Sequence, residues 1–323
     1  MNVLVTGGAG YIGSHACKQL KKHGLNPIVY DNLSRGHEDF VKWGPLIHGD
    51  ILDTTKVEQT LKQYQIEAVL HFAAFAYVGE SVENPTLYYK NNVQGSLSLL
   101  EGMLKANVKK IIFSSTCATY GIPEKIPLTE ELPQNPINPY GQTKLMIEKI
   151  LRDYAPAYGL RSVCLRYFNA AGADPESLIG ENHEPETHII PLAIESALKN
   201  KVLKIFGSDY STPDGTCLRD YIHVADLAEA HVLALKYLNT SDKNFDYFNL
   251  GNEKAFSVKE IVKAVEEVSN LKVNAEIYPR RSGDPAVLVS DSTKAKNILK
   301  WTPEIKDIKE IIRTAYNWHK KNL

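Results

Sequence analysis

Short apolar runs alternate with amphipathic stretches along the first half of the chain. Five of the runs lie in the segments NVLVTGG, NPIVYDN, GPLIHGDILD, AVLHFAAF and KKIIFSST, and each ends in polar or glycine-rich residues. Between them, apolar residues recur at helical spacing over residues 14–23, 54–64 and 85–106. Strands that alternate with helices predict a parallel sheet with helices on both faces, in which ligands bind at the carboxyl ends of the strands.

The pattern changes after Arg166, where long loops such as NAAGADPESLIGENHEPETH interrupt it. The segments DYIHVADLAEAHVLALKYL and DYFNLG resume it. We therefore expect an α/β protein with a Rossmann-type, doubly wound parallel sheet and a smaller C-terminal α/β substrate domain. Residues 1–170 would form the first domain, with segments near 220–252 returning to it, and residues 171–323 would form most of the second.

The segment TGGAGYIG contains two overlapping glycine spacings, one starting at Gly7 and the other at Gly8, and both continue through Gly10 and Gly13. A pyrophosphate can lie at the amino end of a helix only where no Cβ blocks the turn, so that backbone N–H groups face the anion. Because the glycines lie between the first strand and the first helix, they predict a dinucleotide-binding turn.

Asp31 ends the second strand. An acid at this position accepts hydrogen bonds from the adenine ribose hydroxyls and repels the 2′-phosphate of NADP. Arg35 would favour NADP, but in the presence of Asp31 we interpret it as a cation of the loop. The predicted cofactor is NAD.

Tyr140 and Lys144 are four residues apart in the segment NPYGQTK. Asn138 and Pro139 suit the start of a helix, and the amphipathic pattern continues to Tyr158, so the tyrosine and the lysine share one helical face. A phenol has a pKa of about 10, and a neighbouring ammonium favours the phenolate and lowers that pKa. Together with the glycine turn and the upstream SST segment, the pair predicts an enzyme's general base.

Composition and charge exclude several classes of partner. The 323 residues include 43% hydrophobic and 23% charged residues, with a net charge of −1, which is typical of a soluble globular protein and offers no basic patch for nucleic acid. The chain starts with an apolar strand pattern, without a basic leader or an apolar stretch of membrane-spanning length, so we expect a cytoplasmic protein with no membrane partner. The cysteines lack C-x-x-C spacing and are expected to be reduced, packed thiols: Cys17, Cys117, Cys164 and Cys217.

Seven motifs, in this order, resemble the extended short-chain dehydrogenase/reductase superfamily and, within it, the UDP-glucose 4-epimerases: TGGAGYIG, DNLSRG, FSSTCATYG, NPYGQTK, RYFNAAG, DGTCLRDYIHV and RRSGD. The resemblance covers essentially the whole chain. It implies an isomerase with tightly bound NAD that interconverts UDP-galactose and UDP-glucose through a transient 4-keto sugar. It also implies a homodimer that pairs through helices near residues 86–106 and 140–158.

The resemblance assigns roles to residues of this sequence. Tyr140 would be the general base and acid, Lys144 would bind the nicotinamide ribose and lower the pKa of the tyrosine, and Thr116 would hydrogen-bond the sugar 4-hydroxyl. The implied cofactor residues are Gly7, Gly10, Tyr11, Ile12, Gly13, Asp31, Asn32, Asp50, Ile51, Phe72, Ala73, Ala74, Asn92, Ser114, Tyr140, Lys144 and Tyr167. The implied UDP-sugar residues are Thr116, Asn169, His188, Phe206, Arg219, Tyr221, Arg281 and Asp284.

The implied reaction leaves no net oxidation. Tyr140 removes the 4-hydroxyl proton while hydride passes from C4 to NAD, the ketone turns over, and hydride returns to its other face. The diphosphate holds the sugar meanwhile through contacts remote from C4. In related 4,6-dehydratases an acidic pair follows the threonine, whereas Cys117 and Ala118 follow Thr116 here, so elimination lacks its general acid.

Two departures from the hexose pattern leave the sugar open. Ala76 stands where many hexose epimerases have lysine, and AYVGES with SSTCATYG is more similar to the plant UDP-xylose 4-epimerases. Leu288 stands where hexose-restricted members have tyrosine and N-acetyl-tolerant members have a small residue. UDP-xylose or UDP-arabinose and UDP-N-acetylhexosamines are therefore alternative substrates.

Two further interpretations concern other classes of site. A non-catalytic sensor of NAD or nucleotide sugars is the alternative from another class of protein, but such a sensor should have lost Tyr140 or Lys144. The histidines at 183, 188 and 223 match no zinc spacing, so we expect no metal site.

Overall fold

The structure is a computed structural model that describes residues 1–281 and 284–322. Its larger sheet has seven strands in the order β10–β6–β5–β4–β1–β2–β3, and every neighbouring pair is parallel. The strands are β1 (Asn2–Thr6), β2 (Asn26–Asp31), β3 (Leu46–His48), β4 (Ala68–His71), β5 (Lys110–Ser114), β6 (Arg161–Tyr167) and β10 (Phe245–Leu250).

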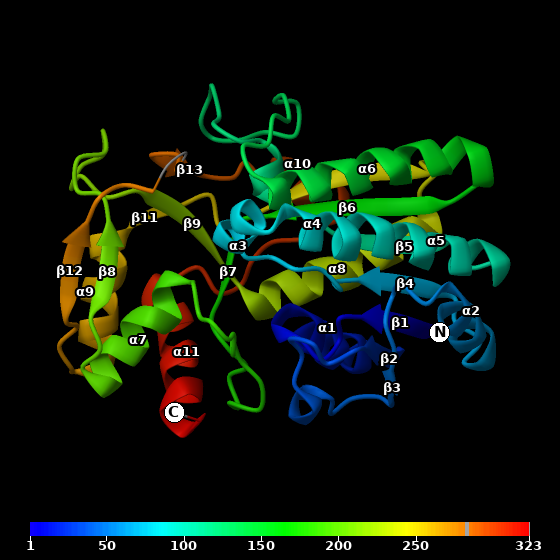
Figure 1. Ribbon diagram of the computed structural model, residues 1–323, viewed down its shortest axis with the longest axis horizontal. Helices are drawn as coiled ribbons and strands as arrows, with labels where there is room; N and C mark the ends of the chain where they lie inside the picture. The colour runs from blue at the N-terminus through cyan, green and yellow to red at the C-terminus, as the bar shows by residue number, and fades with distance from the viewer. Residues whose placement is uncertain (282–283, 323) are drawn as a thin grey trace.

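Helices cover both faces of this sheet, as Figure 1 shows. One face packs against α1 (Tyr11–Lys22) and α8 (Val224–Thr240), whose apolar residues share a core cluster with those of the strands. The other face packs in the same way against α2 (Thr54–Gln63), α5 (Gly95–Lys105) and α6 (Pro139–Tyr158). The predicted doubly wound α/β fold is confirmed.

The direction of the chain through the sheet reverses at β1. The chain moves outward from β1 to β2 and β3, and then crosses to β4 and continues on the other side. The carboxyl ends of β1 and β4 are adjacent, since Thr6 pairs with His71 in register. In an open parallel sheet this switch point is where ligands bind, so the segments after Thr6 and His71 should line a site.

Two of the predicted helices differ from their expected bounds by more than one residue. The first helix begins at Tyr11 rather than Ser14, because Gly10 already takes the N-cap position. The stretch expected as one helix over 85–106 comprises α4 (Pro85–Tyr88), the π-helical η2 (Tyr89–Gln94) and α5. A π-helical turn is common at functional sites and shifts the side chains that follow it.

The second half of the chain builds a smaller unit (Figure 1). Its four-stranded sheet contains β7 (Asn169–Ala171), β9 (Leu218–His223), β11 (Ala255–Ser257) and β13 (Val287–Leu288), and β8 (Leu203–Phe206) pairs with β12 (Ala275–Tyr278). The helices α7 (Ile189–Lys199), α9 (Val258–Ser269) and α11 (Ile308–Asn322) share one apolar core. The segment 220–252 is divided between the units, since β9 belongs to the smaller sheet whereas α8 and β10 pack on and extend the larger one.

Short helices complete the chain: η1 (Glu38–Phe40), α3 (Val78–Glu83), η3 (Cys117–Thr119) and α10 (Thr293–Ile298). None of the helices within 1–281 and 284–322 is both long enough and apolar enough to cross a bilayer. The motif RRSGD extends over residues 282 and 283, which lie outside the described residues.

Candidate active site

The glycine turn after β1 has no room for side chains. A Cβ at Gly7, whose φ is +73°, would lie 2.6 Å from the backbone nitrogen of Ala73, and one at Gly13 would lie 2.2 Å from the carbonyl oxygen of Gly7. Helix α1 starts immediately after the turn, and no described side chain caps its amino end. The turn therefore presents backbone N–H groups and the positive end of a helix dipole, which is the environment that the pyrophosphate of NAD requires.

Asp31 is fixed against this turn from the end of β2. Its Oδ2 accepts a hydrogen bond of 3.0 Å from the backbone N–H of Ala9, and its Oδ1 accepts one of 2.9 Å from that of Leu33. Burial raises the pKa of Asp31, and the two backbone hydrogen bonds oppose that change. Each carboxylate oxygen can accept a further hydrogen bond. The predicted contact with the ribose hydroxyls of NAD is therefore compatible with these two bonds.

Asn32 and Asp50 join the loops that follow β2 and β3. The Asn32 amide donates a hydrogen bond of 3.0 Å to Asp50 Oδ2. Ile51 follows Asp50 directly in the chain. A Cβ added at Gly95 would lie only 2.7 Å from the Cδ1 atom of Ile51, so the two residues are in close contact. The three predicted cofactor residues therefore lie together at the carboxyl edge of the sheet.

Arg35 is paired with an acid that the sequence analysis did not single out. Its Nη2 lies 2.7 Å from both carboxylate oxygens of Glu80, and its guanidinium stacks on the rings of Phe75 and Tyr77 at 4.3 and 4.5 Å from their centroids. This pairing offsets the charge of Arg35 and agrees with its interpretation as a loop cation rather than a binder of a 2′-phosphate.

Tyr140 and Lys144 lie on the buried face of α6. The helix starts as predicted, with Pro139 in its first turn and the Asn138 side chain accepting a hydrogen bond of 2.8 Å from the Gly141 N–H. Lys144 Nζ lies 5.9 Å from the centroid of the Tyr140 ring and donates a hydrogen bond of 2.6 Å to the carbonyl oxygen of Ser114. The pair is thereby attached to the carboxyl end of β5.

Thr116 and Ser114 complete this part of the site. Burial raises the pKa of Tyr140 far above its ordinary value, and a hydrogen bond with Thr116 only partly offsets the effect. Ser114 Oγ lies 2.5 Å from the hydroxyl of Tyr167. The predicted catalytic residues Tyr140, Lys144 and Thr116 are therefore brought together with two of the predicted cofactor residues.

The ionisation of this pair differs from the expectation. Lys144 was expected to lower the pKa of Tyr140, but burial dominates both groups and lowers the pKa of Lys144 itself to about 7, against an opposing effect of Glu148. The physical reason is desolvation, which disfavours the charged form of a buried phenol and of a buried amine alike. In the protein alone, burial favours the neutral phenol of Tyr140, whereas the Lys144 amine is charged in part of the molecules near pH 7.

Glu148 of α6 forms a buried ion pair with Arg166 of β6, which was not predicted from the sequence. Arg166 of β6 donates hydrogen bonds to both Glu148 oxygens, the shortest being 2.6 Å from Nη2, and both side chains are almost fully buried. Ser115 Oγ donates to the same carboxylate at 2.5 Å, and Arg166 Nη1 donates to the Tyr120 hydroxyl at 3.0 Å. The pair ties α6 to the ends of β5 and β6.

Asn92 connects the loop after β4 to α6. Its side chain accepts a hydrogen bond of 2.8 Å from the Phe75 N–H and donates one of 3.0 Å to the Phe75 carbonyl and one of 3.1 Å to Thr143 Oγ1. Asn92 is fully buried, so this clamp fixes the course of the chain just after Phe72, Ala73 and Ala74. Its predicted contact with the cofactor stays a prediction.

All of the predicted substrate residues except Thr116 lie in the smaller unit. Arg219 Nη2 lies 2.5 Å from Asp284 Oδ1, and Arg281 stacks on the Phe206 ring at 4.1 Å from its centroid. A cavity of about 30 Å³ is lined by residues that include Asn169, His188 and Tyr221. Seven of the eight residues thus form three groups, and the eighth, Thr116, lies with Tyr140. Burial raises the pKa of the Cys117 thiol, next to Thr116, to about 12, although the positive charge of Arg219 opposes this change.

Four side chains of the loop before α7 form a further cluster, which the sequence analysis did not predict. Glu181, His183, Glu186 and His188 bring their ligand atoms within 4.8 Å of one another. Burial lowers the pKa of His183, but the two carboxylates outweigh it and raise that pKa to about 10. His223, the third histidine considered in the sequence, lies elsewhere and contacts Thr314 Oγ1 at 3.0 Å.

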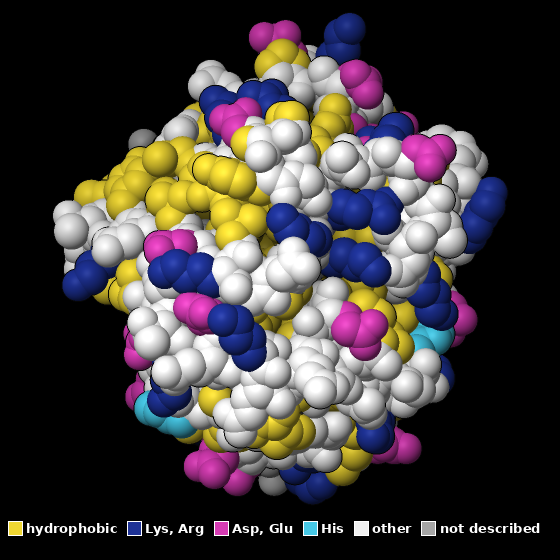
Figure 2. Space-filling view, turned by 90° about the vertical axis from the view of Figure 1, so that its right-hand side faces the viewer, with side chains coloured by type: hydrophobic (Ala, Val, Ile, Leu, Met, Phe, Trp, Pro, Cys, Tyr) yellow, Lys and Arg dark blue, Asp and Glu magenta, His cyan; other side chains and the backbone are white. Residues whose placement is uncertain are grey.

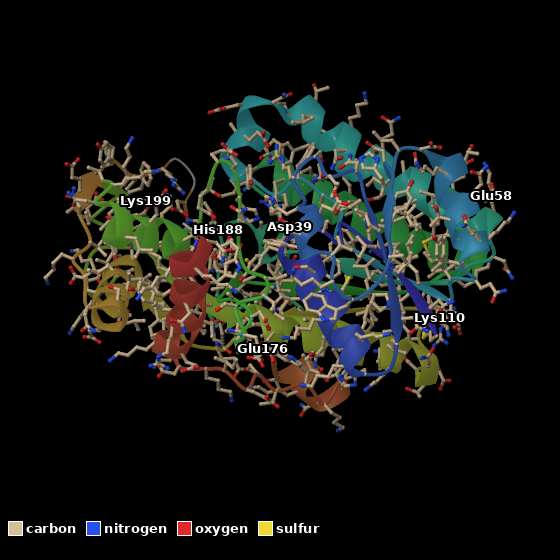
Figure 3. All side chains as sticks on the ribbon, turned by 90° about the horizontal axis from the view of Figure 1, so that it is seen from below. Asp39, Glu58, Lys110, Glu176, His188 and Lys199 are labelled. Carbon is tan, nitrogen blue, oxygen red and sulfur yellow. The ribbon has the colours of Figure 1, made fainter. Side chains whose placement is uncertain are left out.

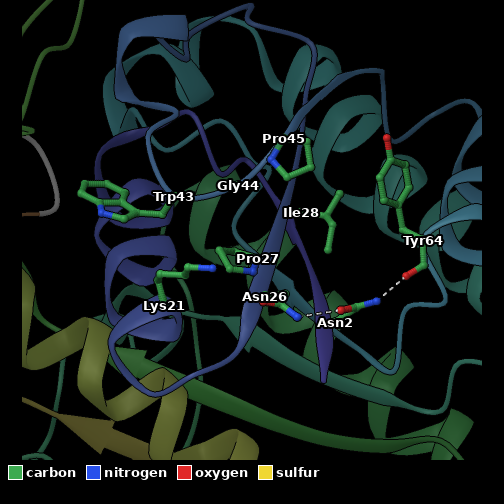
Figure 4. Close-up of a pocket in the computed structure, with 9 residues that line it drawn as sticks. All are labelled: Asn2, Lys21, Asn26, Pro27, Ile28, Trp43, Gly44, Pro45 and Tyr64. Atoms are coloured by element: carbon green, nitrogen blue, oxygen red, sulfur yellow. Dashed lines mark hydrogen bonds between the residues drawn. The ribbon is translucent and has the colours of Figure 1, made fainter.

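A second cavity, of about 310 Å³, lies at the opposite edge of the sheet (Figure 4). It is lined by residues from the amino ends of β1 and β2, such as Asn2 and Asn26, together with Lys21 and Trp43. None of the predicted site residues lines it, so we assign it no part in the chemistry.

Comparison with known proteins establishes the class. The profile of the NAD dependent epimerase/dehydratase family matches residues 3–251, and the chain belongs to this family. A UDP-glucose 4-epimerase of Rhizobium meliloti (strain 1021) is 52% identical over 321 residues, covering 99% of this chain and 97% of that protein.

Solved structures agree with this result. The crystal structure of UDP-glucose 4-epimerase from Brucella ovis in complex with NAD superposes with a TM-score of 0.95 at 51% identity, covering 98% of this chain and 97% of that one. The crystal structure of UDP-glucose 4-epimerase from Bifidobacterium longum in complex with NAD+ and UDP superposes with a TM-score of 0.95 at 39% identity. The match covers 100% of this chain and 99% of that one. Three predictions from the sequence are confirmed: membership of the epimerase family, the isomerase class and the NAD cofactor.

Proposed function

We propose that this protein is a UDP-glucose 4-epimerase that interconverts UDP-galactose and UDP-glucose. The observation that carries the proposal is the meeting of Tyr140, Lys144 and Thr116 at the sheet edge that also holds the glycine turn. The similarity of the whole chain to proteins of that name supports the choice of reaction.

Tyr140 is the proton-transfer group in this proposal. Its phenolate takes the proton of the sugar 4-hydroxyl, and at the end of the turnover the phenol returns a proton to the 4-oxygen, so no proton is gained or lost. NAD, when bound, supplies the acceptor and donor of the C4 hydride. Because burial favours the neutral phenol, Tyr140 needs a neighbouring positive charge, and protonated Lys144 provides it from one helical turn away.

The UDP group is held by the smaller unit. Arg219 and Arg281 offer guanidinium groups that suit diphosphate oxygens, while Asn169 and Tyr221 line the adjoining cavity. Asn169 is already oriented by a hydrogen bond of 2.8 Å to the carbonyl oxygen of Asp220. Contacts on the nucleotide let the sugar turn without leaving the protein.

Leu288 is the residue from which we expect selectivity for the sugar. It lies in β13 directly opposite Arg219 in the parallel register, and it packs against the apolar cluster of Tyr120, Leu128 and Phe168. Its side chain is smaller than the tyrosine of hexose-restricted enzymes, so UDP-N-acetylglucosamine is the second candidate substrate. UDP-xylose remains a candidate because lost contacts seldom exclude a smaller sugar.

The test is an NMR time course of the purified protein with UDP-galactose, UDP-xylose or UDP-N-acetylglucosamine and no added cofactor. We expect conversion to the C4 epimer, fastest with UDP-galactose, and a loss of about 100-fold or more in the Tyr140→Phe variant. The exposed Tyr89 serves as the matched control, since Tyr89→Phe should keep full activity. No conversion of any sugar, even after NAD is supplied, would contradict the proposal and favour the sensor.

A homodimer is also part of the proposal. Figure 2 shows hydrophobic side chains gathered at the upper left of that face, and Leu97 of α5 and Tyr158 of α6 are 38% and 48% exposed. Apolar residues on these two helices suit an interface between two copies of the chain. Light scattering should give the mass of a dimer, and Leu97→Glu should shift it towards that of the monomer.

For the location we propose the cytoplasm. All four cysteines are free in the structure, which suits a reducing compartment. Cell fractionation with an antibody against the protein is the direct test, and recovery in a secreted fraction would contradict the proposal.

A further inference from the structure

The loop between β7 and α7 brings together two histidines and two carboxylates. His183 Nδ1 lies 3.2 Å from Glu181 Oε1 and 3.8 Å from Glu186 Oε1, and His188 Nδ1 lies 3.9 Å from Glu186 Oε1. His188 Nδ1 also contacts Glu181 Oε1 directly. Four potential ligand atoms from four different side chains therefore lie within 4.8 Å of one another.

The separations suit ligands of a single small cation. Zinc binds histidine nitrogen and carboxylate oxygen at roughly 2.0–2.2 Å, so two ligands of a tetrahedral zinc lie about 3.4 Å apart. The His183–Glu181 separation lies near this value, the two separations from Glu186 are slightly longer, and His188 and Glu181 are closer together. Two histidines and a glutamate also form a donor set that zinc uses in proteins.

Hydrogen bonding alone does not account for the cluster. His183 Nδ1 is buried and is within 3.2 Å of a carboxylate oxygen, yet it has no hydrogen-bond partner among the described residues. Its ring is thus turned so that the nitrogen is near the oxygen without the alignment of a hydrogen bond. The contact of this nitrogen with Glu181 is therefore electrostatic and lacks a hydrogen bond, and a cation between the ligand atoms would satisfy the nitrogen directly.

Glu181 and Glu186 contribute differently to the cluster. Glu181 is almost fully buried, with its carboxylate between the two imidazoles. Glu186 Oε1 accepts hydrogen bonds of 2.7 and 2.8 Å from the backbone N–H groups of Thr187 and His188, which fix the orientation of its carboxylate. Glu181, His183 and His188 are therefore the principal ligands, and Glu186 completes the set.

The cluster lies where the two halves of the site approach each other. The His183 ring makes edge contacts with Tyr11, at the start of α1, and with Tyr77, after β4, at centroid distances of 6.3 and 5.6 Å. Glu181 and His188 line the cavity shared with Asn169 and Tyr221. Figure 3 shows His188 at the boundary between the part that contains α7 and α11 and the part built on the larger sheet.

We propose that Glu181, His183, Glu186 and His188 bind one divalent transition-metal ion, zinc foremost, and that this ion fixes the loop 181–188 between the glycine turn and the substrate cavity. The ion acts by positioning the loop and takes no part in the transfer of hydride or proton. The proposal does not depend on the identity of the sugar.

The experiment measures metal content directly. The protein, without a polyhistidine tag, is produced in zinc-supplemented medium, purified without chelators and analysed by inductively coupled plasma mass spectrometry. We expect about one zinc per chain, lost in His183→Ala and in the nearly isosteric Glu181→Gln, and retained in His48→Ala, which removes an exposed histidine elsewhere. Circular dichroism confirms that each variant is folded.

A second measurement tests the ligands in the folded protein. After treatment with EDTA, added zinc should raise the melting temperature of the wild type by several degrees, and it should leave that of Glu181→Gln unchanged. Cobalt(II) should give the visible absorption of a tetrahedral site in the wild type alone. Zinc content below about 0.1 per chain with no thermal response, or equal zinc in the wild type and in both loop variants, would overturn the proposal.

Discussion

Lys144 donates a hydrogen bond of 2.6 Å from its side-chain nitrogen to the backbone carbonyl oxygen of Ser114, the last residue of β5. The bond holds the amine one helical turn from Tyr140, and the Phe113 ring lies 4.9 Å from the same nitrogen. Burial lowers the pKa of this amine to about 7, so its charge is sensitive to any group placed beside it. Lys144 is therefore the positioned charge on which the acid–base role of Tyr140 depends.

Replacement of Lys144 by methionine should abolish most of the activity. Methionine fills much of the same volume but carries no charge, so the Tyr140 phenolate loses its stabilising neighbour, and we expect turnover to fall by about 100-fold or more. The rate of epimerisation and the amount of NAD that is released on denaturation are both measured. Lys149→Met, on the exposed side of the same helix, is the control and should keep the wild-type rate. A Lys144→Met variant as active as that control would remove the role we give to Lys144.

Replacement of Asp31 by asparagine should weaken both the turn and the preference for NAD. The carboxylate accepts backbone N–H groups of Ala9 and Leu33 on different oxygens, and an amide can offer an acceptor to only one of them. We expect a loss of about 1–2 kcal/mol in the free energy of unfolding. Because the negative charge is also gone, the ratio of NAD to NADP affinity should fall.

Calorimetric titration of NAD and NADP into the cofactor-free wild type and Asp31→Asn measures that ratio. Arg35 should not by itself convert the variant into an NADP enzyme, because Glu80 holds its guanidinium. An unchanged ratio would show that Asp31 acts on the turn and not on the ribose.

Features set by local pattern could be predicted from the sequence. The glycines, Asp31 and the Tyr140–Lys144 spacing each belong to one strand end or one helix face, and the parallel sheet brings the strand ends to one edge. Thr116, which the family resemblance indicated, follows β5 directly and shares a hydrogen bond with Tyr140, while its contact with the sugar stays a prediction.

Features set by long-range contact could not be predicted in this way. Arg219 and Asp284 are 65 positions apart and meet only because β9 and β13 pair. The pKa of Tyr140 also depends on how deeply α6 is buried, and the spacing of Tyr140 and Lys144 in the sequence does not reveal that burial. The cluster of residues 181–188 was not predicted, because its four side chains come from an irregular loop with no periodic pattern. The spacing of the histidines alone also leaves out the two glutamates.

Removal of one partner of the buried Glu148–Arg166 pair should be strongly destabilising. In Glu148→Ala the guanidinium of Arg166 would remain buried without its carboxylate, at a cost of about 3–5 kcal/mol. The double variant Glu148→Met/Arg166→Met should lose less, because no charge is left unpaired. Urea denaturation of the two variants measures both values, and equal losses would show that the volume of the side chains, rather than their charge, determines the effect.

His231 of α8 should make the protein less stable in mild acid. It is fully buried against Phe72 and Tyr167, and burial lowers its pKa to about 4, although its Nδ1 contacts the carbonyl oxygen of Leu227 at 2.8 Å. Between about pH 4 and pH 6.5 the unfolded chain binds a proton here that the folded chain does not, so stability falls as the pH falls through this range. His231→Phe removes the difference and keeps an aromatic ring at the position.

The comparison is made by chemical denaturation at pH 7 and pH 5. The free energy of unfolding of the wild type should fall by about 2 kcal/mol more than that of His231→Phe over this interval. His48→Phe, at an exposed position, is the control and should follow the wild type. If His231→Phe followed the wild type as well, the imidazole would be protonated in the folded state, and its buried contacts with the two aromatic rings would have to accommodate a charge.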